Sequence, residues 1–228
     1  MPVRFFKKAE NNLCFQFWNC VDLFYDMRIC GRSLVRYVPS VFRDDKAGVG
    51  STGSQSTHYV ILKRIFSNVH LSSDDAFLDI GCGKGRVLAF LVSQKCPCPL
   101  YGVELNEAVG KEAEKWASRY KQISIIIGDA FLLDYNKFTV LSLARPFLPK
   151  TFYNCVDLLE STLTHPITLI YWYDQQSGNY LKNRSGWELQ TTETVERING
   201  IKISSAYLRY SIWTFDPQKK ESSCIGPE

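Results

Sequence analysis

The sequence predicts an α/β fold in which one mostly parallel sheet is covered by helices on both faces. Over residues 51–216, short apolar runs alternate with amphipathic stretches, which is the pattern of strands and helices in such a sheet. Three glycines recur in a turn after the first of these strands, and acidic residues end three strands. A length of 228 residues and an apolar content of 45% suffice for one domain with an extension.

The expected strands, in chain order, are 76–80, 100–104, 123–127, 138–143, 167–173, 187–196 and 206–215. The expected helices of this region are 57–68, 85–95, 106–120 and 149–163. The helix 106–120 is the weakest of these, because Gly110 in its interior costs about 1 kcal/mol relative to alanine. The last two strands alternate in polarity around Asn199-Gly200, so we expect an antiparallel pair there.

The most informative segment is the decapeptide 77–86, which reads Phe-Leu-Asp-Ile-Gly-Cys-Gly-Lys-Gly-Arg. Glycine adopts positive φ without strain and has no Cβ, so a ligand can lie against the backbone of Gly81, Gly83 and Gly85. The following helix begins with unpaired N–H groups, and the segment therefore predicts a nucleoside-type ligand. The dinucleotide fingerprint requires a glycine where this chain has Arg86, so a nicotinamide cofactor is disfavoured.

Two further acidic residues follow strands. Glu104 ends the strand 100–104, where a carboxylate can accept hydrogen bonds from both hydroxyls of a ribose. Asp129 follows the buried strand 123–127 after a single glycine. Open α/β sheets bind ligands at the carboxyl ends of their strands, so we expect Asp79, Glu104 and Asp129 at one site.

The pattern Asp79-x-Gly81-x-Gly83-x-Gly85 resembles motif I of the class I methyltransferases, which use S-adenosylmethionine. The resemblance covers most of the chain and extends to a bacterial group of unassigned substrate. It implies a Rossmann-like, seven-stranded, mostly parallel sheet that ends in an antiparallel hairpin. It further implies that Glu104 holds the ribose and that Asp129 accepts from the adenine amino group. The cofactor contacts implied around these motifs are Asp79, Gly81, Cys82, Gly83, Glu104, Leu105, Asp129 and Ala130.

The segment from Gly48 to Tyr59 is rich in glycine and serine and leads into an apolar helical run. Ser56 or Thr57 can cap that helix. The segment resembles the entry of the same bacterial methyltransferases, which reaches the methionine end of the cofactor. The resemblance implies that Gln55, Thr57 and Tyr59 contact S-adenosylmethionine; the alternative is an ordinary capped helix after a linker.

In this family the substrate side follows the fourth strand, where this chain has Arg145, Pro146 and Phe147. Enzymes that methylate amino groups have a hydrogen-bond acceptor at the position of Arg145, and arginine cannot accept. Arg145 therefore suggests a carboxylate or phosphate on the substrate, or else an intramolecular ion pair. Candidates for a catalytic base are His58, Tyr173 and Asp174, on position alone, since Tyr173 and Asp174 end the fifth strand.

Residues 1–50 differ from the rest because they are rich in aromatic side chains, and apolar spacing predicts a helix over 10–27. This N-terminal extension is either a lid over the site or packing at the edge of the core. The methyltransferase domain is expected over 51–216. Residues 217–228 are polar and are expected to form a loose tail.

The composition excludes several other classes. A net charge of +4 without a clustered basic stripe does not indicate a nucleic-acid partner. The eight cysteines form no C-x-x-C pair and the three histidines are scattered, so no metal site is expected. The sequence shows no secretory leader and no apolar run long enough for a membrane span. These features favour a cytoplasmic protein with free thiols, and they leave its oligomeric state open.

The expected function is therefore methyl transfer from S-adenosylmethionine to an unidentified acceptor, with a small molecule favoured over protein or RNA. A non-catalytic module or partner subunit that binds S-adenosylmethionine is the main alternative. An aminopropyl transferase shares the fold and motif I, but it needs an acid pair where this chain has Arg145 and Pro146. A nicotinamide oxidoreductase is disfavoured by Arg86.

Overall fold

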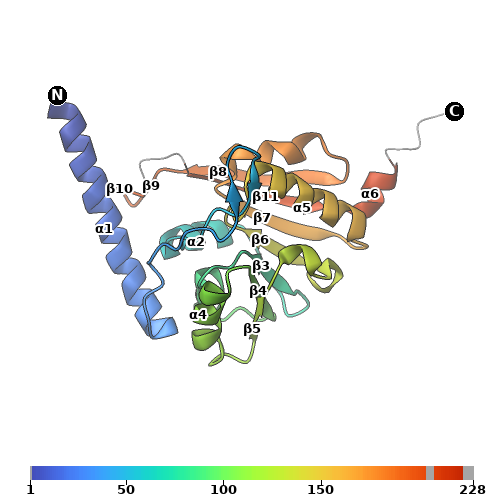
Figure 1. The fold of residues 1–228 in the computed structure, drawn as a ribbon, viewed down its shortest axis with the longest axis horizontal. Coiled ribbons are helices and arrows are strands. Elements are labelled where there is room, and N and C mark those ends of the chain that lie inside the picture. Colours follow the sequence, from blue (N-terminus) through green and yellow to red (C-terminus); the bar gives the residue numbers. More distant parts are fainter. Residues whose placement is uncertain (1, 204–207, 223–228) are drawn as a thin grey trace.

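The structure, a computed structural model, describes residues 2–203 and 208–222 and contains one seven-stranded sheet (Figure 1). Its strands lie in the order β5-β4-β3-β6-β7-β11-β8. The strands are β3 (Phe77–Ile80), β4 (Leu100–Glu104), β5 (Ile123–Ile127), β6 (Val140–Leu143), β7 (Ile167–Trp172), β8 (Trp187–Val195) and β11 (Leu208–Phe215). The first five of these strands run parallel, and β11 is antiparallel to both β7 and β8. This topology confirms the predicted fold class.

Six helices accompany the sheet in the described ranges. They are α1 (Pro2–Cys30), α2 (Tyr59–Phe66), α3 (Arg86–Ser93), α4 (Glu107–Ala117), α5 (Pro149–Thr162) and α6 (Pro217–Ser222). One apolar cluster joins α1, α2 and α3 to one face of the sheet, and a second cluster joins α5 to the other face. None of the helices in residues 2–203 and 208–222 has both the length and the hydrophobicity that a membrane crossing requires.

Neighbouring residues of a strand contribute to opposite clusters. Phe77 and Val140 pack on the α3 side, whereas Leu78 and Leu141 pack on the α5 side. Side chains of successive strand residues point to opposite faces, and a sheet covered on both sides therefore needs continuous apolar runs. Such runs are what the sequence shows, and they explain why the bounds of β4 and β5 agree with the predicted ranges.

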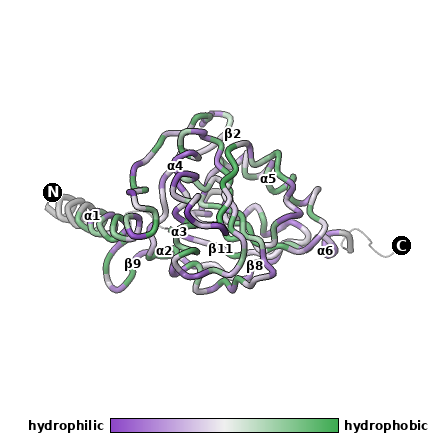
Figure 2. Tube along the Cα trace, turned by 90° about the horizontal axis from the view of Figure 1, so that it is seen from below, coloured by the Kyte–Doolittle hydropathy of each residue, from purple (hydrophilic) through white to green (hydrophobic). Residues whose placement is uncertain are grey.

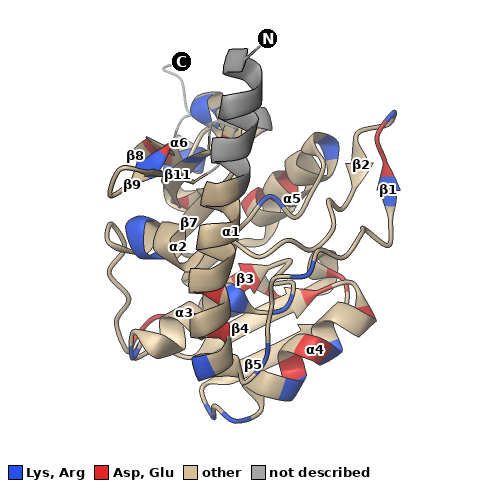
Figure 3. Cartoon of the chain, turned by 90° about the vertical axis from the view of Figure 1, so that its left-hand side faces the viewer, with Lys and Arg blue, Asp and Glu red and all other residues tan. Residues whose placement is uncertain are grey.

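The glycine in α4 is explained by close packing on the sheet. A Cβ at Gly110 would lie 2.9 Å from Cγ1 of Ile127 on β5, so a larger residue would push the helix away. The cost in helix propensity is thus offset by the contact between α4 and β5. The charged residues of α4 face away from the sheet, and on the face drawn in Figure 3 basic and acidic positions are interspersed.

Four elements differ from the sequence-based expectation. The first helix is longer than the predicted 10–27 and spans Pro2–Cys30. A short hairpin of β1 (Arg43–Asp44) and β2 (Val49–Gly50) precedes the domain. A second hairpin of β9 (Arg197–Ile198) and β10 (Ile201–Lys202) carries the Asn199-Gly200 turn, so that turn does not join β8 directly to β11. Part of the expected loose tail forms α6, and Cys224 lies outside the described residues.

The same structure contains short 3-10 helices in connections that the sequence left as loops. They are Ala130–Leu132, Tyr135–Lys137, Asp174–Gln176 and Gly178–Asn183. The first of them follows β5 and begins at Asp129, whose side chain accepts a hydrogen bond from the backbone N–H of Phe131 at 2.9 Å. Asp129 is thereby fixed at the carboxyl end of the sheet.

A buried group of charges holds α1 on the rest of the protein. The guanidinium of Arg86, at the start of α3, donates to Asp26 at 2.7 Å and to Asp22 at 2.8 Å. All three side chains are at most 3% exposed. Asp26 also accepts from the backbone N–H of Leu34 at 2.8 Å. Buried charges of this kind are tolerated only when they are paired and hydrogen-bonded, so each partner depends on the others. Figure 2 shows α1 at one edge of the molecule, where this group is its main polar attachment.

Replacing one of these aspartates should therefore destabilise the whole chain. We expect Asp26→Ala to lower the free energy of unfolding by about 3 kcal/mol, because it leaves the Arg86 charge buried and half-paired. Urea denaturation monitored by circular dichroism measures this change. The control is Asp45→Ala, which breaks an exposed pair with Arg43 and should leave the midpoint almost unchanged. A loss below about 1 kcal/mol for Asp26→Ala would contradict the anchoring role.

Candidate functional site

The glycine turn after β3 adopts the backbone conformation that the sequence predicts. Gly81, Gly83 and Gly85 have φ values of 69°, 58° and 84°, which side chains with a Cβ rarely adopt. Their surroundings are also tight. A Cβ at Gly81 would lie 2.4 Å from Cβ of Pro146, and one at Gly83 would lie 2.6 Å from Oγ of Ser54. Glycine is therefore required at this turn both for the fold of the backbone and for the approach of neighbouring segments.

Asp79, on β3, is the most unusual group near this turn. Its carboxyl is 2% exposed, and its Oδ1 atom has no hydrogen-bond partner among the described residues. Burial raises the pKa of Asp79 to about 8, an effect that the hydrogen bond from Ser142 opposes and the nearby Glu104 reinforces. Unpartnered buried carboxylate oxygens are rare, because they carry a desolvation cost. Oδ1 of Asp79 is thus available to interact with a positively charged or hydrogen-bond-donating group of a ligand.

Glu104, at the end of β4, faces the same turn. Its Oε2 accepts from the backbone N–H of Gly83 at 2.9 Å, and its Oε1 accepts from the N–H of Asn106 at 2.9 Å. Burial raises the pKa of Glu104, and these backbone hydrogen bonds act in the opposite direction. Each oxygen retains further acceptor capacity, since a carboxylate offers about four lone-pair directions. The two bonds fix the carboxylate in an orientation suited to accept from a diol.

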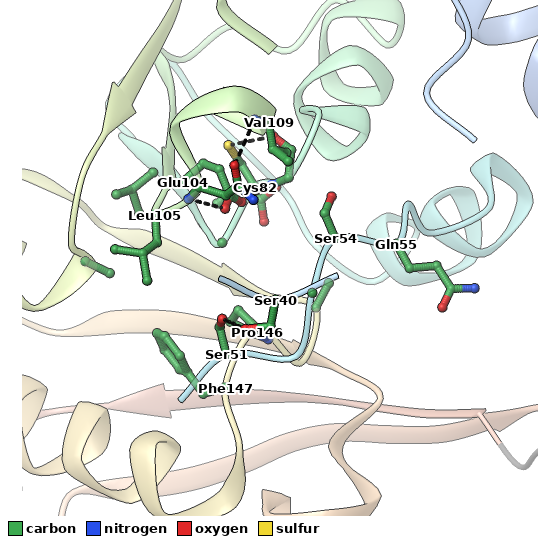
Figure 4. Close-up of a pocket in the computed structure, with 18 of the residues that line it drawn as sticks. Ser40, Ser51, Ser54, Gln55, Cys82, Glu104, Leu105, Val109, Pro146 and Phe147 are labelled. Carbon is green, nitrogen blue, oxygen red and sulfur yellow. Dashed lines mark hydrogen bonds between the residues drawn. The ribbon is translucent and has the colours of Figure 1, made fainter. Parts of the chain in front are cut away.

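These residues surround a narrow cavity at the carboxyl ends of β3, β4 and β5 (Figure 4). Cys82, Glu104 and Val109 lie on one side, and Ser40, Ser51, Pro146 and Phe147 lie opposite. The cavity measures about 90 Å³. Of the cofactor contacts expected from the sequence, it is lined by Gln55, Thr57, Asp79, Gly81, Cys82, Gly83, Glu104, Leu105, Asp129 and Ala130. The predicted substrate residues Pro146 and Phe147 line it as well.

Tyr59 is the expected cofactor contact that does not line this cavity. Its ring is 4% exposed and lies under the guanidinium of Arg86, 5.4 Å from it, beside the ring of Tyr25. The physical reason is the start of α2, where Asp22 of α1 accepts from the backbone N–H of Tyr59 at 3.0 Å. This contact turns the residue toward α1, so the structure corrects the expectation for Tyr59.

The predicted cap of α2 is also wrong. The helix begins after His58, whose side chain makes no capping hydrogen bond. Ser56 instead donates to the carbonyl of Leu34 at 2.8 Å. The first N–H of α2 is satisfied from a distant helix by Asp22, a partner that no local capping pattern reveals. A carboxylate at a helix N-terminus is favourable for electrostatic reasons too.

A second cavity, of about 590 Å³, adjoins the first. The two share Gly53, Gln55, Ser56, Thr57 and Ala144. The second cavity is lined further by aromatic and basic side chains, which are Phe15, Tyr37, Arg43, His58, Arg145, Trp172 and Tyr173. Its size falls within the range of about 300–1,000 Å³ that is typical of small-molecule sites. Arg145 belongs to this cavity and not to the narrow one, although Pro146 and Phe147 follow it directly.

Arg145 and Tyr173 form one unit in the larger cavity. The guanidinium of Arg145 lies 4.1 Å from the centre of the Tyr173 ring. Both residues follow strands, β6 and β7, and both have positive φ, 49° and 61°. Such conformations cost about 1–3 kcal/mol each in non-glycine residues and concentrate at functional sites. Arg145 forms no ion pair with a described residue, so the alternative of an intramolecular ion pair is not what the structure contains.

His58 lines the larger cavity and is paired with Asp22. Nδ1 of His58 lies 2.7 Å from Oδ2 of Asp22, which is 1% exposed and also bound to Arg86. A carboxylate held beside an arginine is an acceptor only, so Nδ1 carries a proton, and in the neutral imidazole Nε2 is then the acceptor. The sequence did not reveal Asp22, because it lies 36 residues before His58.

Asp174 does not belong to either cavity. It is 2% exposed and accepts from Nε of Arg209 at 2.5 Å and from Oγ of Ser211 at 2.6 Å. These bonds join the end of β7 to β11, so the structure directs Asp174 toward β11 and away from both cavities, contrary to the expected position in the crevice. Tyr173, predicted at the end of the fifth strand, and His58, predicted in the segment before α2, both line the larger cavity.

The segment Gly50–Thr57, between β2 and α2, covers the narrow cavity. Thr52 donates from its hydroxyl to the carbonyl of Arg145 at 2.6 Å and from its N–H to the carbonyl of Pro146 at 3.0 Å. Ser51 forms a β-bridge with Phe147. A local reading of the sequence identified this segment as a loop but gave no sign that it pairs with the chain after β6.

The chain is similar in sequence to one protein family and in fold to several solved structures. Residues 46–136, which contain the glycine turn, Glu104 and Asp129, match the family described as histone methylation protein DOT1. Among solved structures, the fold is similar to that of an RNA methyltransferase from Salinibacter ruber in complex with S-adenosyl-L-homocysteine, with a TM-score of 0.54. The identity is 18%, over 76% of this chain and 97% of that chain.

Two further solved structures are similar to a comparable degree. The M1A22 tRNA methyltransferase TrmK of B. subtilis has a TM-score of 0.53 and 12% identity, over 73% of this chain and 70% of that chain. A structure that concerns the conversion of a disulfide bond into a thioacetal group during echinomycin biosynthesis has a TM-score of 0.53 and 14% identity. It covers 73% of this chain and 84% of that chain. The seven-stranded sheet and its glycine turn thus have the fold of these methyltransferases, and the family match extends over residues 46–136 of the chain.

The burial of Asp79 predicts a pH dependence of stability in the ligand-free protein. Its folded pKa of about 8 lies above its unfolded value near 4, so its contribution is fully present below about pH 4 and is lost as the pH rises through 8. We expect Asp79→Asn to be more stable than the unmodified protein by about 3 kcal/mol at pH 9, with a much smaller difference at pH 5. Urea denaturation at both pH values measures this; equal differences at the two would contradict it.

Proposed function

We propose that this chain is a methyltransferase that holds S-adenosylmethionine in the narrow cavity and its methyl acceptor in the larger one. The observation that carries the proposal is the buried, unpartnered Oδ1 of Asp79 beside a glycine turn that admits no side chain. S-adenosylmethionine is positively charged at its ammonium and sulfonium groups, and a buried carboxylate complements that charge. The two cavities share five lining residues, so a donor and an acceptor bound in them would be neighbours.

The residues of the narrow cavity fit the parts of the cofactor. Glu104 is the proposed acceptor for the ribose hydroxyls, because its carboxylate is fixed by two backbone N–H groups and keeps free lone pairs. Asp129 and Ala130, at the end of β5, are proposed to contact the adenine. Gly81, Cys82 and Gly83 provide the turn against which the ligand lies, with Gln55, Thr57 and Leu105 at the margin of the cavity.

Binding requires the covering segment to move. The narrow cavity of about 90 Å³ is smaller than the roughly 300 Å³ at the lower end of small-molecule sites. Ser54 and Pro146 lie directly on the glycine turn. Their segments are joined by the bonds of Thr52, by the bridge of Ser51 and by hydrogen bonds that Gly50 forms with Leu148 and Thr151. We therefore expect Gly50–Thr57 to draw back as the ligand enters. Closure afterwards would exclude water from the reacting groups.

The cofactor supplies a methyl group already activated on its sulfonium, so the protein mainly has to align the acceptor and exclude water. In the larger cavity, Nε2 of His58 is the proposed proton acceptor, with Asp22 holding Nδ1–H at 2.7 Å. Asp22 acts through His58 and is a positioning residue. Arg145, stacked on Tyr173, is proposed to bind an anionic group of the acceptor, since a guanidinium pairs with carboxylate or phosphate.

These features favour a small acidic molecule with an N–H or O–H group as methyl acceptor. An RNA acceptor is the second candidate, because two of the similar solved structures are RNA methyltransferases. The net charge of +4 is small, and on the side drawn in Figure 3 the described basic and acidic positions are interspersed, which does not favour a phosphate backbone as partner. A module that binds the cofactor without transferring its methyl group is the remaining alternative.

The ribose assignment is tested by a single substitution. We expect Glu104→Gln to weaken binding of labelled S-adenosylmethionine about 10- to 100-fold, because hydrogen bonds to a charged acceptor contribute about 1.5–3 kcal/mol. Equilibrium dialysis measures the affinity. Glu114→Gln, at an exposed position of α4, is the matched control and should bind like the unmodified protein. Unchanged binding by Glu104→Gln would show that the ribose lies elsewhere.

Transfer is tested with labelled cofactor and three fractions of a cell extract: small molecules, protein and RNA. We expect label in the small-molecule fraction, a loss of about 100-fold in kcat for His58→Gln that lessens as the pH is raised, and a higher KM for Arg145→Gln. Arg64→Gln, on the surface, is the control. Label in RNA would establish the second candidate, and binding without any transfer would establish the non-catalytic alternative.

A further inference from the structure

The helix α1 has two faces of different character. One face carries Trp18, Asp22, Asp26 and Ile29, all buried against the protein. On this side Asp22 and Asp26 bind Arg86, and Nε1 of Trp18 donates to the carbonyl of Lys202 at 2.9 Å. At about 100° per residue, some of the positions between these residues, such as Cys20 and Phe24, fall on the opposite side of the helix. Figures 1 and 2 show no other element on that outer side of α1.

The outer side carries a continuous apolar stripe. It consists of Leu13, Phe17, Cys20, Phe24 and Met27, and we refer to these five residues as the outer stripe. Their spacings of four, three, four and three residues place them along one line of a helix. All five are exposed; Leu13 is 68% exposed, Phe24 63% and Met27 52%.

The surface around the outer stripe lacks charge along Leu13–Met27, and the exposed Arg28 lies just beyond its end. Between Leu13 and Met27 the only charged residues are Asp22 and Asp26, and both are buried on the inner side. The other exposed positions of this stretch are Phe15, Gln16, Leu23 and Tyr25. Figure 3, in which α1 lies in front of the other elements, shows most of its described part without charge colouring. Depletion of charge together with aromatic residues is the composition of the core of a protein–protein interface.

We propose that the outer stripe is a self-association surface, through which two copies of this chain pair by their α1 helices. The alternating three- and four-residue spacing is that of a coiled-coil seam, in which the side chains of one helix fit between those of an identical helix. A two-fold interface uses the same patch on both subunits, and this patch brings no charge against its own copy. A second copy of the chain therefore presents the same apolar line, without a charge between Leu13 and Met27 to oppose the pairing.

The area of the patch fits this occupant. Taking about 150–250 Å² for a fully buried aromatic side chain, the outer stripe with Leu23 presents on the order of 500 Å². That is near the upper end of the apolar patches found on monomers, which measure about 300–600 Å². A standard interface buries about 800 Å² per partner, and the exposed Gln16 beside the outer stripe extends the patch toward that size.

A membrane surface is disfavoured as the occupant by the same facts. Helices that lie on membranes combine an apolar face with an exposed polar face rich in lysine and arginine. Here the face opposite the outer stripe is buried against the protein and contains the two aspartates bound to Arg86. The described part of α1 thus has no exposed cationic face along Leu13–Met27.

Sedimentation velocity over a range of protein concentrations tests the proposal. We expect the unmodified protein to form a dimer with twice the mass of the 26.1 kDa chain. Phe24→Glu and Phe17→Glu should raise the dissociation constant at least about 100-fold, since each puts a charge into the centre of the seam. Leu132→Glu is the matched control, because Leu132 lies outside α1, is 84% exposed and should not affect the dimer.

Cross-linking tests the geometry without any change of sequence. A two-fold axis near the middle of the outer stripe brings Cys20 close to its own copy in either relative direction of the helices. We expect a short bismaleimide to convert the unmodified protein to a covalent dimer and to leave Cys20→Ser as a single chain. This readout stands even if a glutamate variant fails to fold.

Several results would overturn the proposal. They are an unmodified protein that stays monomeric up to about 100 μM, variants that dimerise as tightly as the parent, or a dimer that Leu132→Glu also dissociates. Binding of the monomer to phosphatidylglycerol vesicles through Phe24 would likewise assign the stripe to a membrane. Binding of S-adenosylmethionine by Phe24→Glu reports separately on the proposed function, since the outer stripe touches neither cavity.

Discussion

The guanidinium of Arg86, buried between Asp22 and Asp26, is the contact on which the rest of the arrangement depends. It joins the N-terminal helix to the first helix after the glycine turn. Asp22 in turn fixes both the start of α2 and the ring of His58. One buried set of charges thus couples the N-terminal extension, the wall of the larger cavity and the proposed base. The arginine that breaks the dinucleotide fingerprint has a structural reason to be there. The N-terminal extension was expected to be either a lid or packing at the edge of the core. The structure shows that its helix α1 also holds His58 and the start of α2 in place.

Much of the fold is encoded locally and is predictable from the sequence. The strands β4 and β5 are short apolar runs bounded by polar residues, and their predicted ranges match the structure. The antiparallel pair β8 and β11 is confirmed, but the Asn199-Gly200 turn belongs to a separate hairpin. The length of α1 and the pairing of the β2 segment with the chain after β6 were not predictable, because both depend on contacts between residues distant in sequence.

The site divides in the same way. Asp79, Glu104 and Asp129 could be placed together because parallel strands end at one edge of a sheet, and the structure brings them to one cavity. Their roles toward the cofactor stay predictions. Tyr59 and Asp174 were misplaced because their orientation is set by distant partners, Asp22 and the pair Arg209 and Ser211.

Neither the larger cavity nor the Asp22–His58 pair could be predicted from the sequence of any single segment. They arise only where α1, the loop before α2 and the ends of β6 and β7 meet.

The central claim is that a sulfonium nucleoside occupies the narrow cavity. Calorimetric titration with S-adenosylmethionine, S-adenosylhomocysteine and NAD tests this claim most directly. We predict saturable 1:1 binding of the first two and no heat of binding with NAD. Binding of NAD, or no binding of either adenosyl compound, would contradict the account.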